Sequence, residues 1–416
     1  MKRIGKIFLK ITEVIVRLVY FGIGLGVIGV VGYFFANFYL KGIHGTDTAH
    51  ALSLVDWVNK YWPKLPFWHH LQGAGVSLRW NYPFLASILV VLIDKLTGLG
   101  ILGSFQVLGF ASFLATALGM YLFVSWRLKN QTAGLIAAVF YFITPLSYAY
   151  FVDWGFYAEL VSCMFFFPPL IFYDLFLEGF LAGKIRLSHR LGLLLTAVFA
   201  ALLFNVHPNT FFALFGVIGL QTILRAIFSL KREKGKKLVK LLPKAFFPSF
   251  LVFLLAVFLT AFVIFNFTYY EKAKKDFASP SEIIAGIQRG DFEHFKLHQS
   301  FPRESFLGLG TLSSEHYLFP LRNITITPLV WGLALVGLVL TLVFDRKVFA
   351  FCLPAFLGFG VIVYPNVFFG PIRLLVKMRL PGIGYLLKQR VYLTLIRSLF
   401  PIAAAFGLVG VGKLVF

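Results

Sequence analysis

The amino-acid sequence predicts an all-α integral membrane protein with about ten transmembrane helices. Apolar residues make up 59% of the chain, whereas soluble domains usually contain roughly 45–50%. Charged residues account for only 13%, and the mean hydropathy is +0.83. Apolar runs of about 20 residues recur along the chain, and each can cross roughly 30 Å of hydrocarbon. A soluble protein of 416 residues could not bury so many apolar helices.

The first expected span follows a basic N-terminal segment and covers about 12–38. It is longer than the h-region of a signal peptide, roughly 7–15 residues, so we expect it to be retained. The segment 83–99 is shorter and contains Asp94 and Lys95, which favours an interfacial helix in the first exterior loop. The other expected spans lie near 101–126, 133–150, 157–180, 191–206, 210–229, 245–267, 326–344, 348–364 and 391–412.

The basic residues predict the orientation of these spans. If 83–99 does not cross the membrane, the most basic loops fall on one side together with the N-terminus, as the positive-inside tendency requires. We therefore expect a multi-pass protein of the cytoplasmic (plasma) membrane with a cytoplasmic N-terminus. The formal net charge of +22 then reflects topology and attraction to the headgroups of membrane lipids. No basic and aromatic surface pattern of a soluble domain accompanies it, which argues against a nucleic-acid partner.

The chain predicts a single transmembrane domain over 1–416, with a first exterior loop at 39–100 and a large one at 268–325. Because the sequence stops shortly after the last span, we leave open whether the native chain continues beyond Phe416. Cys163 and Cys352 lie inside predicted spans without a C-x-x-C partner, so we expect them to act as small packing residues.

The first exterior loop contains a short amphipathic helix. Asp47 or Thr48 can cap it, and it runs to about Tyr61. Its apolar residues recur at spacings of three and four, which suits a helix lying on the membrane surface. They are Ala51, Leu54, Val55 and Val58.

The order of motifs around this loop carries a family resemblance. A basic N-terminus and one span precede G-x-D-x-x-H at 45–50, P-x-W at 66–68 and the pair Tyr82-Pro83. The segment 155–159 before Pro168-Pro169, and the segment 387–390 before the last span, continue the pattern. The chain resembles the GT-C-type glycosyltransferases. Within them it is most similar to prokaryotic membrane proteins labelled as related to 6-pyruvoyl-tetrahydropterin synthase.

The resemblance implies a GT-C-like fold and an inverting membrane glycosyltransferase. Its partners would be a polyprenyl-phosphate-linked sugar and a glycan or lipid acceptor, which it would join at the exterior face. A carboxylate just outside the first span is well placed to act as the base, and Asp47 is that residue. The alternative role of Asp47 is a helix N-cap.

No cofactor is established from the sequence, although a divalent metal stays open. The candidate ligands are His44, Asp47 and His50, whose spacing matches no metal signature. His50 lies three residues after Asp47, so it could orient that carboxylate instead.

The remaining candidate residues would bind substrate. Arg390 and Arg397 are seven residues apart on one face of the last span, where a lipid phosphate could pair with both. An arginine within a span is costly and needs a partner or a ligand. Tyr82, Glu159 and His207 lie at the same predicted face. Alternatively, Glu159 interacts favourably with the helix dipole at the N-terminus of its helix, and His207 is a turn residue without a role in binding.

Two other functions stay open from the sequence. One is a transporter or flippase of a lipid-linked or amphiphilic substrate, which should place ionisable groups near mid-membrane. The other is a non-catalytic membrane scaffold that docks partners through its exterior loops. Most spans are free of charge at their centres and polar residues gather at one face, which favours surface chemistry over transport.

Overall fold

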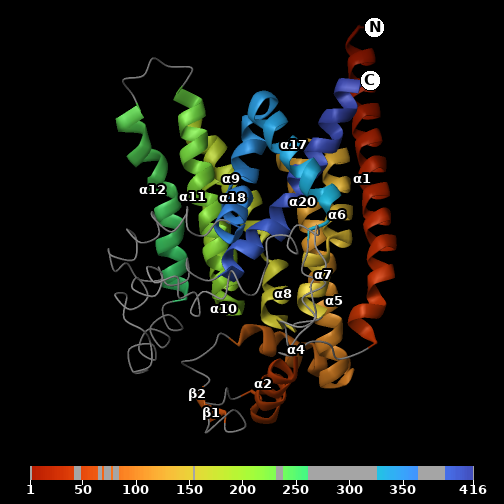
Figure 1. The fold of residues 1–416 in the computed structure, drawn as a ribbon. Coiled ribbons are helices and arrows are strands. Elements are labelled where there is room, and N and C mark those ends of the chain that lie inside the picture. Colours follow the sequence, from red (N-terminus) through yellow and green to blue (C-terminus); the bar gives the residue numbers. More distant parts are fainter. Residues whose placement is uncertain are drawn as a thin grey trace.

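The computed structural model describes residues 2–41, 48–63, 68–69, 76–77, 84–152, 155–230, 238–260, 326–363 and 389–415. The described chain is almost entirely helical and forms a bundle of roughly upright helices (Figure 1). Helix α1 begins at the end of the bundle where α20 finishes, and we name this the termini end. The opposite end carries α2, and we name it the α2 end.

Over the described residues, each expected span coincides with one helix or with two consecutive helices. Residues 261–267 of the span expected at 245–267, and the whole exterior loop expected at 268–325, lie outside them. The bounds are α1 Lys2–Leu40, α5 Gly100–Leu122, α6 Gln131–Ile143 with α7 Pro145–Val152, α8 Tyr157–Cys163 with α9 Phe167–Leu181, α10 Leu187–Val206, α11 Pro208–Leu230, α12 Leu238–Leu259, α17 Pro328–Phe344, α18 Arg346–Val363 and α20 Gln389–Val415. A π-helical turn, η1 Phe123–Arg127, extends α5.

Six of the described segments are long and apolar enough to cross a membrane. They are Thr12–Asn37, Gly100–Arg127, Tyr157–Leu181, Leu187–Val206, Pro208–Phe228 and Val391–Val415. The multi-pass membrane architecture is confirmed. The count of ten spans, the orientation and the host membrane stay predictions.

The α2 end carries the short elements of the first predicted exterior loop. They are α2 Thr48–Tyr61, α4 Leu85–Thr97 and the antiparallel strands β1 Trp68–His69 and β2 Val76–Ser77. Helix α2 has the expected bounds, but Val55 and Val58 are buried in a cluster with Val90 of α4. The apolar stripe is therefore covered by protein and does not lie on the membrane surface. Helix α4 rises only about 20 Å, which agrees with a helix that does not span.

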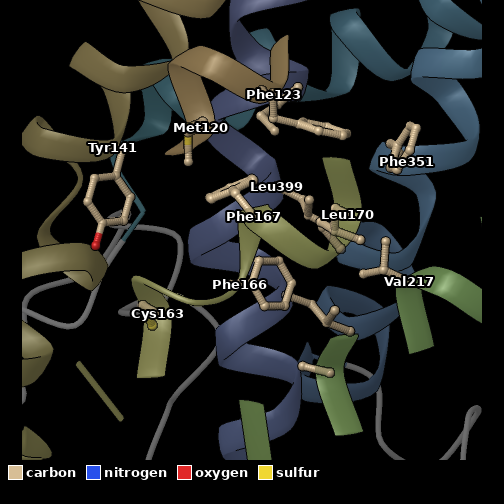
Figure 2. Packing of buried hydrophobic residues seen from close by; sticks show 14 of the residues in the cluster. Met120, Phe123, Tyr141, Cys163, Phe166, Phe167, Leu170, Val217, Phe351 and Leu399 are labelled. Atoms are coloured by element: carbon tan, nitrogen blue, oxygen red, sulfur yellow. The ribbon is translucent and has the colours of Figure 1, made fainter. Parts of the chain in front are cut away.

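The centre of the bundle is a continuous apolar layer. Figure 2 shows Phe123, Leu170, Phe351 and Leu399 packed there from four helical segments, together with Phe166 from the turn between α8 and α9. The layer matters for function because it separates two buried polar clusters, one toward each end of the bundle.

Helix α20 is positioned by a close crossing with α17. A Cβ atom at Gly337 would collide with the backbone of α20 at Ala403, and one at Gly407 would collide with the backbone of α17 at Leu333. Small residues of this kind let membrane helices pack backbone to backbone. The crossing fixes α20, which carries one half of the polar cluster described next.

Candidate functional site

The described residues include only part of the predicted site. Asp47, His44 and Tyr82 lie outside them, as does the side chain of Arg390. His50 lies on α2 and is exposed. No group of three potential metal ligands occurs among the residues that were described. The roles of Asp47 as base and of His44, Asp47 and His50 as metal ligands therefore stay predictions.

Glu159 and Arg397 are brought together in the bundle. Glu159 lies in the first turn of α8, and Arg397 lies eight residues into α20, about 12 Å from its start. Both side chains are almost fully buried, and Arg397 Nη2 lies 3.5 Å from Glu159 Oε1. The sequence predicted that Arg397 needs a partner or a ligand, and Glu159 is a partner.

Thr394 and Cys163 complete this group, which we call the Glu159 cluster (Glu159, Cys163, Thr394 and Arg397). The Thr394 hydroxyl donates to Glu159 Oε1 at 3.2 Å. Arg397 Nη2 in turn donates to Thr394 Oγ1 at 3.2 Å and to Cys163 Sγ at 2.9 Å. Thr394 precedes Arg397 by three residues and Cys163 follows Glu159 by four, so each helix presents two members on one face.

The interpretation of the two cysteines is corrected in one case. Cys352 is buried in the apolar cluster, as expected of a packing residue. Cys163 is equally buried, yet its sulfur accepts a hydrogen bond from Arg397. It therefore has a polar contact that its apolar sequence neighbours did not indicate.

A second polar contact joins α11 to α8, the helix that carries Glu159 and Cys163. α10 ends at Val206, His207 has an extended backbone, and α11 begins at Pro208, so the predicted turn is confirmed. His207 is buried, at 3% exposure. The hydroxyls of Thr210 and Ser162 lie 2.6 Å apart, which links the start of α11 to α8 beside the Glu159 cluster.

A separate ionic group lies toward the termini end, and we call it the Asp174 cluster. It consists of Arg127 of η1, Asp174 and Glu178 of α9, Arg225 of α11 and Lys347 of α18.

Asp174 is fully buried at the centre of this cluster. Its carboxylate lies 2.7 Å from Arg127 and 2.9 Å from Lys347, and it also pairs with Arg225. Glu178, one turn further along α9, pairs with Arg127 at 2.6 Å and with Lys347 at 2.7 Å. Charge-assisted bonds of this length are strong in an apolar bundle, so the cluster joins four helical segments.

The sequence did not predict this cluster, because Arg127 and Lys347 flank apolar spans and are therefore expected in the basic loops of the predicted topology. A signal was present, because Asp174 and Glu178 lie four residues apart within an apolar span. Carboxylates in a span require cationic partners, and the nearest cations in the predicted topology were those at the same end of the bundle.

Comparison with known proteins shows a similarity at the level of the fold. No protein-family model and no curated protein matches it. It is similar to the archaeal oligosaccharyltransferase AglB of Archaeoglobus fulgidus, solved in complex with an inhibitory peptide and a dolichol-phosphate, with a TM-score of 0.58 and 10% identity. The apo form of the Archaeoglobus fulgidus oligosaccharyltransferase gives a TM-score of 0.55 and 12% identity.

Both matches cover 94% of this chain and 50% of the archaeal chain, so the protein spans about half the length of these structures. At this identity the likeness shows the fold alone: the chain shares the helical membrane fold of these oligosaccharyltransferases. This agrees with the predicted GT-C-like fold. The narrower resemblance to proteins related to 6-pyruvoyl-tetrahydropterin synthase stays a prediction.

Proposed function

We propose that the protein is a membrane glycosyltransferase that moves a sugar from a polyprenyl-phosphate donor to an acceptor hydroxyl of a glycan or lipid. The observation that carries this proposal is the fold likeness to an oligosaccharyltransferase over 94% of the chain. That enzyme was solved with a dolichol-phosphate, which is itself a lipid-linked phosphate. A donor of the same chemical class suits this fold.

The α2 end is the proposed place of reaction. It carries α2, whose first residue directly follows Asp47, and toward it lies the Glu159 cluster. Arg397 supplies a cation for the donor phosphate, since guanidinium groups bind phosphate bidentately. Glu159 and Thr394 hold that guanidinium in position. Arg390, seven residues earlier on α20, lies about 10 Å nearer to the α2 end and would meet the phosphate first.

The proposed reaction is a single inverting displacement. The acceptor oxygen forms a bond to the anomeric carbon while the bond from that carbon to the phosphate oxygen breaks. Asp47 takes the proton of the acceptor hydroxyl, and the electron pair of the broken bond leaves with the polyprenyl phosphate. One carboxylate is sufficient because the lipid phosphate is already a good leaving group.

The experiment is a transfer assay with the purified full chain in detergent and a panel of polyprenyl-phosphate sugars. Asp47→Asn should fold normally, because Asn caps a helix about as well as Asp, and lose roughly 100-fold or more in turnover. Asp56→Asn is the matched control, since Asp56 is exposed on α2. Near-normal transfer by Asp47→Asn would reject Asp47 as the base and shift the role to Glu159 or His50.

Two further arms of the assay test the remaining parts of the proposal. Loss of transfer on adding a chelator, with recovery on adding Mg²⁺ or Mn²⁺, would support a metal at His44, Asp47 and His50. No transfer by the unaltered chain with any donor would favour the non-catalytic scaffold.

The apolar layer at the centre of the bundle favours transfer at one end over transport. Along α8, the turn after it and α9, the order is Glu159 and Cys163, then the apolar Phe166 and Leu170, and then Asp174. Figure 2 shows Cys163, Phe166 and Leu170 of this series. Among the described residues, the two ionic clusters are therefore separated by aromatic and aliphatic side chains. A transporter should place ionisable groups near mid-membrane.

A further inference from the structure

A cavity of about 730 Å³ opens at the termini end, on the far side of the apolar layer from the Glu159 cluster. It lies between α17, α20, the start of α18 and the turn that joins η1 to α6. Its volume falls in the range of small-molecule and cofactor sites. Because it lies at the other end of the bundle, the proposed transfer reaction does not use it.

The polar part of the cavity wall is cationic. Arg127, Lys129, Lys347 and Lys413 contribute four positive charges, and the carboxylates that line the cavity are those of Glu178 and Asp345. Four cations against two carboxylates leave a formal charge of +2 in the wall.

These cations differ in how fully they are neutralised by protein. Arg127 is only 8% exposed, and both Arg127 and Lys347 form ion pairs with Asp174 and Glu178. Lys129 and Lys413 are both exposed, and neither makes an ion pair within the residues that the structure describes. The wall cations that make no ion pair among the described residues are therefore these two exposed lysines, whereas the more deeply buried Arg127 is already paired.

The rest of the wall is apolar. Leu340 and Phe344 of α17 line the cavity together with Phe406 and Val409 of α20. Phe344 is 73% exposed and Leu414 is 67% exposed, so apolar side chains also reach the rim of the cavity beside the lysines. Cationic groups above an apolar slot match an amphiphile with an anionic head and a hydrocarbon chain, and a water-soluble anion would leave the slot unused.

We propose that this cavity binds an anionic membrane phospholipid. Its phosphate would pair with Lys129 and Lys413, and the first part of one acyl chain would lie along the apolar wall formed by α17 and α20. The predicted orientation places the cavity in the cytoplasmic leaflet, where anionic phospholipids give the surface a negative potential. Binding here is independent of sugar transfer at the α2 end.

The test uses the purified full chain in a neutral detergent and native mass spectrometry with phosphatidylglycerol or phosphatidylcholine. We expect tighter binding of phosphatidylglycerol. The double variant Lys129→Asn/Lys413→Gln should weaken it about twentyfold to thirtyfold, since each lysine near an anionic head contributes a factor of about five. Lys129 has a backbone φ of +56°, which Asn also tolerates, so the variant should fold. The matched control is Lys184→Asn/Arg190→Gln, which removes two exposed charges outside the cavity wall.

A second variant tests the apolar slot. Val409→Phe should reduce phosphatidylglycerol binding by filling the slot, whereas Leu408→Phe should not, because Leu408 does not line the cavity. Equal binding of both lipids, or an equal loss in the control pair, would overturn the proposal. So would full competition by inorganic phosphate, which would indicate a soluble anion, or tighter binding of polyprenyl phosphate, which would indicate a different lipid.

Discussion

The two buried ionic groups of this bundle differ in the ion pairs that their members make among the described residues. Asp174 contacts three cations from three helical segments, with its contacts to Arg127 and Lys347 at 2.7 and 2.9 Å. Arg397 lies 3.5 Å from Glu159 and relies on a hydroxyl and a sulfur for further contacts within the cluster. Glu159 and Arg397 are almost fully buried, whereas Glu178 of the Asp174 cluster is 40% exposed and lines the cavity.

This difference distinguishes a cluster that stabilises the bundle from a candidate site for substrate binding. A carboxylate held by several short ion pairs cannot exchange its partners without large energetic loss, so the Asp174 cluster acts as a clamp between helices. A longer ion pair supported by neutral groups has less to lose when a stronger ligand arrives. The contrast supports the proposal that the donor phosphate binds at the Glu159 cluster.

The largest effect should come from the clamp. Asp174→Asn leaves three cations facing a neutral amide and should destabilise the protein by about 3–5 kcal/mol. We expect a lower midpoint of thermal unfolding in detergent and a smaller yield of monodisperse protein. Asp56→Asn, on the exposed face of α2, should change neither. An unaltered midpoint in Asp174→Asn would mean that Glu178 alone satisfies Arg127 and Lys347.

The next effect concerns the Glu159 cluster and separates its stability from its activity. Glu159→Gln should cost about 1.5–3 kcal/mol, because it weakens a charge-assisted contact to a buried guanidinium. The double variant Glu159→Gln/Arg397→Gln removes both charges and should recover most of that stability. It should nevertheless lose donor binding by roughly tenfold or more. Recovery of both stability and donor affinity would show that the pair is only structural.

The sequence predicted the helices well because a membrane span is specified locally. A run of about 20 apolar residues is sufficient, and the flanking basic residues indicate direction. The start of α2 was predicted to within one residue, with Asp47 or Thr48 as the cap, because capping depends on neighbouring residues. The covering of its apolar face by α4 was not predicted, because an apolar stripe fits a protein surface and a membrane surface equally well.

The candidate site was predicted only as separate residues. Glu159 and Arg397 stood out because charges within spans are costly. Their pairing could not be predicted, because it depends on which faces of α8 and α20 meet, and that is fixed by distant contacts such as the crossing of Gly337 and Gly407. Cys163 and Thr394 carried no signal at all, since both residue types are common in apolar helices.

A smaller effect tests the neutral support of the Glu159 cluster. Thr394→Val keeps the shape of the side chain but removes the hydroxyl that donates to Glu159 and accepts from Arg397. We expect a loss of about 1 kcal/mol in stability together with weaker donor binding. Thr394→Ser keeps the hydroxyl and should retain donor affinity. If Val and Ser behave alike, the hydroxyl does not position Arg397.

The smallest expected effect concerns the contact that joins α8 to α11. The hydroxyls of Ser162 and Thr210 lie 2.6 Å apart, and the Ser162 hydroxyl can also bond to the carbonyl oxygen of Glu159 at 2.7 Å. A double-mutant cycle with Ser162→Ala and Thr210→Val should give a coupling energy of about 0.5–1 kcal/mol from thermal unfolding. Since neither residue carries charge, the single variants should leave donor affinity nearly unchanged. A drop in donor affinity as large as that of Thr394→Val would instead place the start of α11, and with it His207, within the substrate site.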